Sequence, residues 1–359
     1  MAVVEPAVLS GPEEISPAWL SAVLGSRVTD ISVVPVGTGQ MADTVRVAVT
    51  YERPGSGPES VVAKLASADE RSRSASAVAR AYEIEVSVYT ELPPLPGVPR
   101  CYYAARDVNT DRFTLILEDM APCVAGDDIA GTDIATATAC LEQLAALHAA
   151  GWEDPAFAAH EWLNRQDPGQ REAMVGLLAM LAPSFLERFA ARIAPEHRAL
   201  VERLLPHLGA MVGGYDGPRT LTHGDYRLDN MLFREGVRTP AVVDWQTAVW
   251  GSPAQDVAYF VGGSLTTENR RAHEEELLDA YHAALVGAGV QGYSREQLGA
   301  DVRPASFGGV VMMFASAILV VQTERGDAMF AEMFRRHAQH ALDVDAEALL
   351  AGPAAAPPG

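Results

Sequence analysis

The chain has 359 residues, of which 48% are hydrophobic and 21% are charged, and this composition excludes disordered, collagenous and fibrous proteins. The length predicts two domains, or one bilobal unit with its site between the lobes. Acidic residues outnumber Lys and Arg by 47 to 27, giving a net charge of −20, which argues against nucleic acid as a partner because cations bind its phosphates.

The first third of the chain has the alternating apolar pattern of strands. We expect a helix at 13–24, strands at 28–36, 43–51 and 60–65, a helix at 75–92, and strands at 98–106 and 112–118. A glycine-containing loop at 37–40 follows the first strand. Residues 1–118 therefore predict an N-terminal lobe with an antiparallel sheet and one main helix.

After residue 118 the apolar residues recur at spacings of three and four, which is typical of helices. Residues 119–132, which contain Pro122, Gly126 and Gly131, are interpreted as a linker. We expect helices at 134–150, 170–189, 195–211, 270–286, 303–321 and 328–349, and short strands at 231–233 and 241–243. Residues 133–351 thus predict a mostly helical lobe of an α+β protein, and residues 352–359 a disordered tail.

The cysteines and the apolar segments bear on the compartment. Cys101, Cys123 and Cys140 are odd in number and lack CxxC spacing, which favours neither disulfides nor a zinc site. Residues 1–16 lack the basic start of a signal peptide, and the longest apolar run, 307–321, is shorter than the ~18 residues that span a bilayer. These features predict a cytoplasmic protein without a membrane partner.

Lys64 is the one lysine of the chain, in which all the other Lys or Arg positions are arginine. A lysine is a compact charge on a flexible stem, which suits contact with a phosphate oxygen and a carboxylate together. The alternative to such a functional role is that Lys64 is present by chance. Because Ala63 precedes it and Leu65 follows it, Lys64 does not belong to a GxxxxGK[ST] phosphate loop.

A second set of polar residues lies between 221 and 256. The segment 221–230 reads LTHGDYRLDN and places Asp225 five residues before Asn230, and Asp244 follows a Val-Val pair 14 residues later. Carboxylate and amide oxygens are ligands for Mg²⁺, which leaves its other positions to substrate phosphates. Asp225 can lie in the same loop without binding the metal, and a hydroxyl nucleophile needs such a carboxylate.

In their order and spacing, these motifs resemble the aminoglycoside phosphotransferase and choline-kinase-like branch of the protein-kinase-like fold. The segment from His223 to Asp225 matches the His-Gly-Asp form of the family's catalytic loop, and the Asn follows at the D-x-x-x-x-N spacing. Asp244, in Asp-Trp-Gln, stands where the family has its second metal ligand, and Lys64, in Val-Val-Ala-Lys, stands where it has its strand lysine. The resemblance covers residues from about 35 to 256.

The resemblance implies a bilobal protein-kinase-like fold and an ATP-dependent O-phosphotransferase with Mg²⁺, in which GTP could replace ATP. It implies the following roles: Lys64, oriented by Glu85, for the α- and β-phosphates; Asn230 and Asp244 for Mg²⁺; Asp225 for the acceptor hydroxyl; Gly37 and Gly39 for the loop over the phosphates; Glu118 and Met120 for adenine. The third glycine of that loop is absent, and no Ala-Pro-Glu segment follows Asp244, so no protein substrate is expected.

The neighbours of these residues have alternative interpretations. His223 is expected to support the loop and not to act as an acid or base, and Asp256 to tie 251–256 to the loop or to cap a helix. Arg227 either contacts phosphate or pairs with a carboxylate. Asp127 and Asp128 are interpreted as a solvated loop, with a cationic substrate as the alternative.

The acceptor is a small hydroxylated molecule whose identity the sequence leaves open. Members of the family act on antibiotics, choline, amino alcohols, sugars and hydroxysteroids, and the arginine- and alanine-rich composition is typical of a high-GC bacterium, where antibiotic inactivation or self-protection is common. A kinase of a metabolite is one alternative. A nucleotide-binding pseudokinase that regulates a partner and a nucleotidyl-transferring variant are two others.

Overall fold

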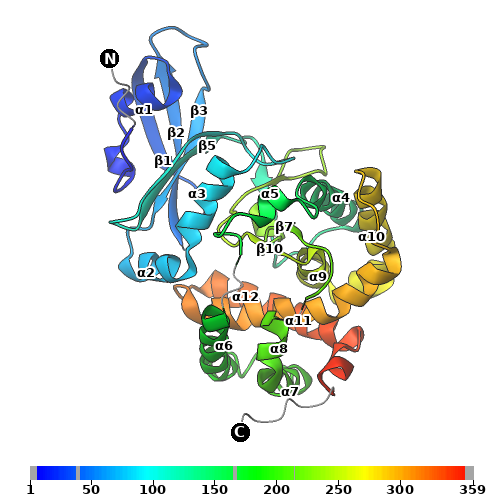
Figure 1. The fold of residues 1–359 in the computed structure, drawn as a ribbon. Helices are drawn as coiled ribbons and strands as arrows, with labels where there is room; N and C mark the ends of the chain where they lie inside the picture. Colours follow the sequence, from blue (N-terminus) through cyan, green and yellow to red (C-terminus); the bar gives the residue numbers. More distant parts are fainter. Residues whose placement is uncertain (1–5, 38–40, 165–167, 214, 352–359) are drawn as a thin grey trace. The chain divides into compact units, whose positions relative to one another are not determined.

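The computed structural model describes residues 6–37, 41–164, 168–213 and 215–351. The chain forms two compact units (Figure 1). The first unit contains Met1–Cys123 and Ala241–Thr247, and the second unit contains Val124–Pro240 and Ala248–Gly359. The expected residues 352–359 of the tail and Gly39 of the glycine loop lie outside the described residues. The lobe and linker boundaries expected from the sequence stay a prediction.

The first unit is built on one antiparallel sheet with the strand order β1-β2-β3-β5-β4. Its strands are β1 (Val28–Pro35), β2 (Ala42–Tyr51), β3 (Ser60–Ala66), β4 (Cys101–Asp107) and β5 (Arg112–Glu118). Every second residue of β2 from Val45 to Val49 is buried, because successive side chains of a strand point to opposite faces. The predicted strands are confirmed, and β5 has the expected bounds.

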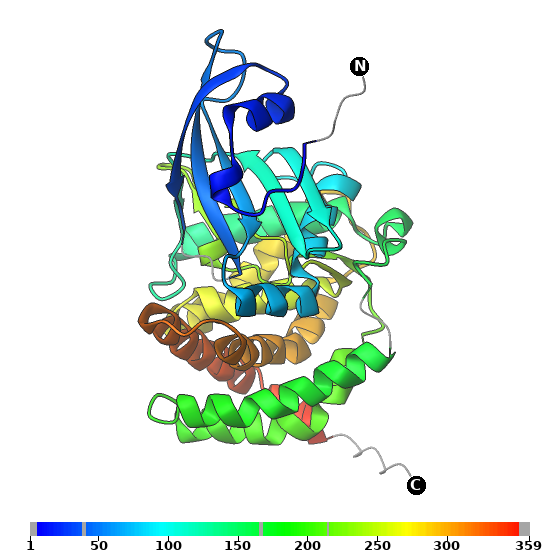
Figure 2. The ribbon, with the colours of Figure 1, turned by 90° about the vertical axis from the view of Figure 1, so that its left-hand side faces the viewer.

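Helices cover both faces of this sheet. On one face, α1 (Pro17–Leu24) packs on Val61, Ala63 and other odd-numbered residues of β3. On the other face, α3 (Ala81–Glu91) packs on odd-numbered residues of β5 such as Phe113 and Leu115. Figure 2 shows α1, in dark blue, against the sheet. Since side chains alternate along β3, Lys64 lies on the face that α3 covers.

The helix expected at 75–92 is two helices, α2 (Glu70–Ala79) and α3. They meet at Arg80, whose backbone has φ 56° in the left-handed region. The Arg80 amide bonds the carbonyls of Ser76 and Ala77 and so closes α2, while α3 restarts with a face that is buried against the sheet. The break was not expected because neither glycine nor proline marks it.

The second unit is mostly helical, as predicted, and the α+β fold class is confirmed. Its helices are α4 (Ile134–Ala150), α5 (Pro155–Ala158), α6 (Pro168–Arg188), α7 (Pro195–Leu204), α8 (Leu208–Gly213), α9 (Pro253–Ser264), α10 (Thr267–Gly287), α11 (Arg295–Leu319) and α12 (Glu324–Asp343). Its short strands β6 (Val124–Ala125) and β8 (Met231–Phe233) pair, as do β7 (Thr220–Thr222) and β10 (Val249–Gly251).

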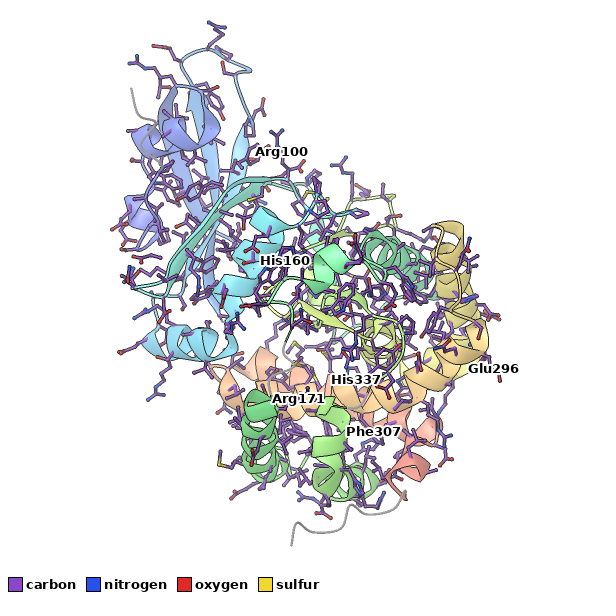
Figure 3. All side chains as sticks on the ribbon, viewed as in Figure 1. Arg100, His160, Arg171, Glu296, Phe307 and His337 are labelled. Atoms are coloured by element: carbon purple, nitrogen blue, oxygen red, sulfur yellow. The ribbon has the colours of Figure 1, made fainter. Side chains whose placement is uncertain are left out.

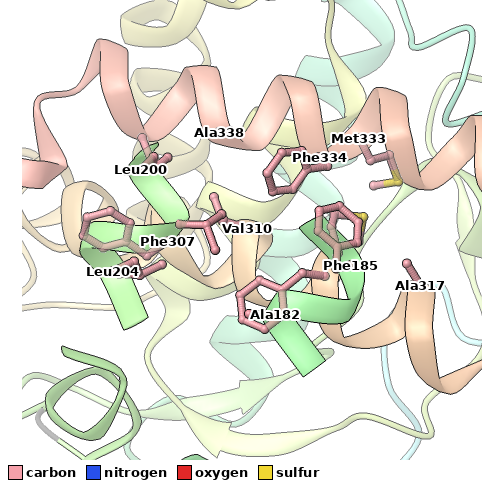
Figure 4. Close-up of a cluster of buried hydrophobic side chains, with 14 of the residues drawn as sticks. Ala182, Phe185, Leu200, Leu204, Phe307, Val310, Ala317, Met333, Phe334 and Ala338 are labelled. Carbon is pink, nitrogen blue, oxygen red and sulfur yellow. The ribbon is translucent and has the colours of Figure 1, made fainter. Parts of the chain in front are cut away.

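Aromatic and aliphatic side chains from α6, α7, α11 and α12 form the core of the second unit (Figure 4). The rings of Phe185 and Phe334 lie 4.8 Å apart, and both side chains are completely or almost completely buried. Phe307 and Val310 of α11 and Leu200 of α7 belong to the same cluster. Contacts of this kind hold these four helices at fixed positions relative to one another.

Several helix bounds differ from those expected. The helix expected at 13–24 is α1, preceded by a short 3-10 helix at Pro12–Glu14, and the helix expected at 328–349 is α12, which begins and ends earlier. The segment 195–211 is divided by a short 3-10 helix, Leu205–His207, which contains a proline. Helix α11 begins eight residues before the expected start, because Ser294 caps it through the Gln297 amide and Pro304 lies inside the helix. Among the described residues, α11 is the one helix long and apolar enough to cross a membrane, and half of its most apolar 18-residue window is buried.

Candidate active site

In the first unit, Lys64 joins two carboxylates from distant parts of the chain. Its Nζ donates to Glu85 Oε1 at 2.7 Å and to Asp244 Oδ1 at 2.8 Å. The side chains of Lys64 and Glu85 are 12% and 1% exposed. Burial alone would lower the pKa of Lys64, but the charges of Asp244 and Glu85 raise it above its usual range. Lys64 is therefore a fixed positive charge on the α3 face of the sheet.

Asp244 has an unusual backbone for a residue other than glycine. Its φ is 69°, in the left-handed region, where such a residue costs about 1–3 kcal/mol and persists only when its surroundings hold it. Trp245, 1% exposed, anchors the next position, and the Val242 amide donates to the Gly97 carbonyl at 2.8 Å. Strained residues of this kind are concentrated at functional sites.

The second unit contributes a loop between β7 and β8 that holds Asp225. Gly224 precedes it with φ 79°, a conformation that glycine adopts without strain. The Asp225 carboxylate accepts from Asn230 Nδ2 at 2.9 Å, from Arg227 Nε at 3.0 Å and from the Tyr259 hydroxyl at 2.8 Å. Asp225 and Asn230 are therefore brought together, as their spacing predicts.

These contacts set the charge of Asp225. Burial raises its pKa, but the charge of Arg227 and the hydrogen bonds from Tyr259 and Arg227 outweigh burial, so the pKa lies below its usual range. The side chain is 17% exposed, so water or a small molecule can reach it. An ionised, accessible carboxylate is what the orientation and deprotonation of a hydroxyl require.

Asp256 of α9 supports the loop from behind. Its Oδ2 accepts from the His223 amide at 2.6 Å and its Oδ1 accepts from the Gly224 amide at 2.8 Å. Its side chain is 1% exposed, and His148 Nε2 lies 3.2 Å away. The prediction that Asp256 ties its segment to the loop is confirmed. So is the supporting role of His223, whose Nδ1 accepts from the Asp225 amide at 3.2 Å.

Arg227 pairs with the carboxylates of three aspartates. Its Nη1 lies 2.5 Å from Asp128 Oδ2 and 3.5 Å from Asp229 Oδ2, in addition to its bond with Asp225. Asp128 is completely buried, and its Oδ1 accepts from the Leu228 amide at 3.0 Å. The expectation that Asp128 belongs to a solvated loop is wrong, because Arg227 and the backbone amide of Leu228 satisfy its oxygens.

The remaining predicted residues are placed as follows. Glu118 ends β5, where its amide donates to the Arg100 carbonyl at 2.8 Å, and the Met120 carbonyl accepts from the Cys123 amide at 2.9 Å. Gly37 has φ 76°. Gly39 lies outside the described residues, and the nucleotide roles of all these residues stay predictions.

The two predicted metal ligands each retain an oxygen. Asn230 uses its amide nitrogen on Asp225, and none of the hydrogen bonds described for the chain engages its side-chain oxygen. Asp244 Oδ2 is met by Gln246 Nε2 at 3.5 Å. Within the described ranges no group of three or more His, Cys, Asp or Glu could hold a metal ion. Amide and carboxylate oxygens are of the chemical kind that Mg²⁺ binds alongside oxygens of phosphates and water.

Sequence patterns did not reveal Tyr259, His148 or Tyr281. Tyr259 lies 34 residues after Asp225, on α9, and the Tyr281 hydroxyl meets His148 Nδ1 at 2.7 Å. In the sequence these residues resemble ordinary core positions of amphipathic helices. Tyr259 contacts Asp225 of the loop, whereas Tyr281 and His148 act behind it, since His148 lies beside Asp256. The packing of α4, α9 and α10 brings these residues together.

The model of the ecdysteroid kinase-like family matches residues 37–289, which is more than half of the chain. The chain belongs to the ecdysteroid kinase-like family. The match contains Lys64, Glu85, Asp225, Asn230 and Asp244. The predicted membership of a small-molecule branch of the kinase-like proteins is confirmed.

Solved structures of other proteins have the same fold, although their sequences are less than 20% identical to this chain. A Ralstonia eutropha protein assigned to the aminoglycoside phosphotransferases has a TM-score of 0.53 at 17% identity, over 91% of this chain and 97% of that one. Plasmodium vivax ethanolamine kinase has a TM-score of 0.50 at 10% identity, over 85% and 82%. Acyl-CoA dehydrogenase family member 11 of Rattus norvegicus is 37% identical over 67 residues, 17% of this chain and 9% of that protein. The chain thus matches less than a tenth of that relative's length.

Proposed function

We propose that this member of the ecdysteroid kinase-like family transfers the γ-phosphoryl group of ATP to a hydroxyl of a small molecule. The observation that carries the proposal is the bonding of Lys64 Nζ to both Glu85 and Asp244. A buried lysine between two carboxylates, one of them on a strained backbone, is costly unless a ligand uses it. A nucleotide with phosphates and a divalent cation is such a ligand.

In this proposal the first unit binds the nucleotide. Lys64 contacts the α- and β-phosphates, and Glu85 holds the ammonium group in place. Asp244 and Asn230 would hold Mg²⁺, which when bound neutralises charge on the phosphates. Gly37 lies in the loop that covers the phosphates, and the backbone near Glu118 and Met120 accepts adenine. GTP remains an alternative donor.

The second unit directs the acceptor. Asp225 accepts a hydrogen bond from the acceptor hydroxyl and takes its proton as the bond to phosphorus forms. Asn230 and Arg227 hold the carboxylate in orientation through its Oδ2. Positioning supplies most of the rate of such a transfer, since effective molarities of well-oriented groups reach about 10⁵–10⁸ M.

The acceptor class is a small hydroxylated molecule, and we propose an antibiotic or another natural product, with resistance or self-protection as the role. The ethanolamine kinase and aminoglycoside phosphotransferase folds support small acceptors of this kind. A metabolite such as choline, an amino alcohol or a hydroxysteroid is the alternative. The net charge of −20 favours cationic or neutral acceptors over anionic ones. We further propose the cytoplasm as the place of action.

The proposal is tested by ADP release with Mg-ATP against aminoglycosides, macrolides, nucleosides, choline, amino alcohols and hydroxysteroids, with the mass of each product recorded. We expect one class to gain a single phosphoryl group, and Asp225→Asn to abolish the gain. Transfer of AMP would instead give the mass of a nucleotidyl group. No product from any acceptor, together with no rise in Tm on addition of Mg-ATP, would overturn the proposal in favour of a regulatory protein.

A further inference from the structure

The two oxygens of the Asp225 carboxylate have different surroundings. Oδ2 accepts from Asn230 Nδ2 at 2.9 Å and from Arg227 Nε at 3.0 Å. Oδ1 accepts from the Tyr259 hydroxyl at 2.8 Å. An ionised carboxylate has about four acceptor sites, two on each oxygen. Both sites of Oδ2 are taken, so within the described part of the chain the open site is on Oδ1.

Tyr259 is held in place by its ring. It lies on α9 with 5% of its surface exposed, and its ring stacks on that of His337 of α12 with the centroids 5.0 Å apart and the planes at 23°. His337 is labelled in Figure 3. Burial, with His340 and Arg336 nearby, lowers the pKa of His337 to about 3. The His337 ring is therefore neutral at physiological pH and stacks as an aromatic ring without charge.

Glycines leave the space that the His337 ring fills. A Cβ at Gly263 would lie 2.8 Å from His337 Nε2, and a Cβ at Gly262 would lie 2.8 Å from His337 Nδ1. A Cβ at Gly309 of α11 would overlap the ring. Both His337 ring nitrogens are buried, with no hydrogen-bond partner among the described residues. The ring therefore serves packing, and its packing fixes the plane of Tyr259.

We propose that Tyr259 is a positioning residue that fixes Oδ1 of Asp225 as the oxygen that receives the proton of the acceptor. The inference rests on the proposed phosphoryl transfer and deepens it. The acceptor oxygen forms a bond to the γ-phosphorus, and the bond from phosphorus to the bridging oxygen breaks with its electron pair leaving on ADP. The proton of the acceptor hydroxyl passes to Oδ1. The hydroxyl of Tyr259 occupies one acceptor site of Oδ1 and so orients the second acceptor site of this oxygen towards the acceptor hydroxyl.

Loss of this hydroxyl changes the orientation of the carboxylate and leaves the nucleotide contacts of the first unit as they are. Tyr259→Phe keeps the ring and its stacking on His337. We expect kcat to fall about 10- to 100-fold, because a displacement of about 1 Å at the reacting atoms costs about 10²-fold. We expect the KM for Mg-ATP to stay within twofold of the wild-type value. A general loss of stability would not lower kcat selectively while leaving the KM for Mg-ATP unchanged.

Tyr293→Phe is the matched control. Tyr293 is 4% exposed, and its hydroxyl donates to Asp301 Oδ2 at 2.9 Å, so this variant also removes a hydroxyl from a buried ring beside a carboxylate. Asp301 lies on α11, outside the catalytic loop. Tyr293→Phe should therefore leave kcat and KM within twofold while lowering Tm as much as Tyr259→Phe does.

The assay uses ethanolamine and water as probe acceptors, with Mg-ATP as the donor, and records ADP release and phosphoethanolamine. A selective fall of kcat in Tyr259→Phe supports the inference. An active wild type with an unchanged kcat in Tyr259→Phe overturns the inference and leaves the proposed function intact. A wild type that transfers phosphate to neither probe nor to any acceptor of the wider panel overturns the proposed function and the inference with it.

A second measurement is independent of turnover. Urea unfolding of the wild type, Tyr259→Phe, Asp225→Asn and the double variant gives the coupling between the two side chains. We expect the unfolding equilibrium constants to show a coupling factor of about tenfold. Additive effects, with a coupling factor below about twofold, would show that the hydroxyl does not hold Oδ1 and would overturn the inference.

Discussion

The site residues of each unit include a cation that pairs with more than one carboxylate, but the two cations differ. In the first unit Lys64 meets Glu85 and Asp244. In the second unit Arg227 meets Asp128, Asp225 and Asp229. A lysine ammonium is a point charge that a phosphate oxygen can share, whereas the planar fork of arginine holds several oxygens in fixed directions. Lysine therefore stands where a ligand is expected, and arginine stands where the loop needs a clamp.

The same comparison separates binding from scaffolding. The Asp244 side chain in the lysine cluster is 28% exposed, and Gln246 Nε2 lies 3.5 Å from its Oδ2. The Asp128 side chain in the arginine cluster is completely buried. Arg227, for which contact with phosphate and pairing with a carboxylate were both open, pairs with carboxylates. Its first task is thus to hold Asp225 and the buried Asp128 together.

The largest expected effect is the loss of the arginine clamp. Arg227→Met leaves Asp128 buried without its cation, and breaking a buried pair in this way typically costs about 3–5 kcal/mol. Urea unfolding should show a fall of this size in the free energy of unfolding. The double variant Arg227→Met/Asp128→Asn should recover part of it, and a double variant no more stable than Arg227→Met would contradict the clamp.

Replacement of the lysine tests the other cluster. Lys64→Ala should lower kcat/KM about 10²- to 10³-fold, the range seen when one donor to a developing charge is removed. Lys64→Arg keeps the charge but presents a planar fork, and we expect it to restore Tm more than kcat/KM. ADP release with the best acceptor of the panel and thermal unfolding measure the two effects. Equal activity of Lys64→Arg and wild type would mean that any cation suffices.

The glycines around His337 test the scaffold that holds Tyr259. Gly309→Ala forces a methyl group into the His337 ring and should cost about 1–3 kcal/mol of stability. Gly308→Ala on the same helix meets nothing within 4 Å and should be neutral, or stabilising by up to about 1 kcal/mol. Thermal unfolding of the two variants, Gly309→Ala and Gly308→Ala, tests this prediction. Equal effects of the two changes would show that the space around the ring is not tight.

The smallest effect concerns Asp343 of α12, which belongs to neither cluster. Burial raises the pKa of its carboxyl, but hydrogen bonds from Arg271, Gln339 and Arg270 outweigh burial and lower the pKa to about 2. A lowered pKa means that the carboxylate stabilises the fold above the unfolded pKa near 4, and that this contribution disappears as the pH falls towards 2. Asp343→Asn should therefore lower Tm by roughly 2–4 °C at pH 7.

The pH dependence supplies the check on that prediction. The difference in Tm between Asp343→Asn and the wild type should shrink steadily below about pH 4, because the wild-type carboxyl then becomes neutral as well. A difference that is independent of pH would assign the loss to packing and not to charge.

Much of the fold follows from local pattern. Period-two alternation predicts the strand at 112–118 and period-3.6 spacing predicts the helix at 134–150, both with the bounds that the structure has. The Lys64–Glu85 pair is also predicted, but from the resemblance to the kinase-like family, which pairs a strand lysine with a helix glutamate. Local pattern is sufficient for the strand and the helix, since each is set by residues near it in the sequence.

The rest depends on contacts that no local pattern records. Asp128 follows a glycine and another aspartate and therefore resembles an exposed loop, and its burial depends on Arg227, 99 residues later. Tyr259 and His337 resemble ordinary core positions on two helices. The packing of α9 on α12 stacks their rings, and the Tyr259 hydroxyl then contacts Asp225. The break at Arg80 has no glycine or proline to mark it.

The central claim is that the lysine cluster binds the nucleotide and that Asp225 directs the acceptor. Isothermal titration of Mg-ATP into the wild type, Lys64→Ala and Asp225→Asn tests this claim without knowledge of the acceptor. The account predicts that Lys64→Ala weakens binding at least about tenfold, a loss of about 1.4 kcal/mol, and that Asp225→Asn binds as tightly as the wild type. Wild-type affinity in Lys64→Ala, or an equal loss in Asp225→Asn, would contradict it.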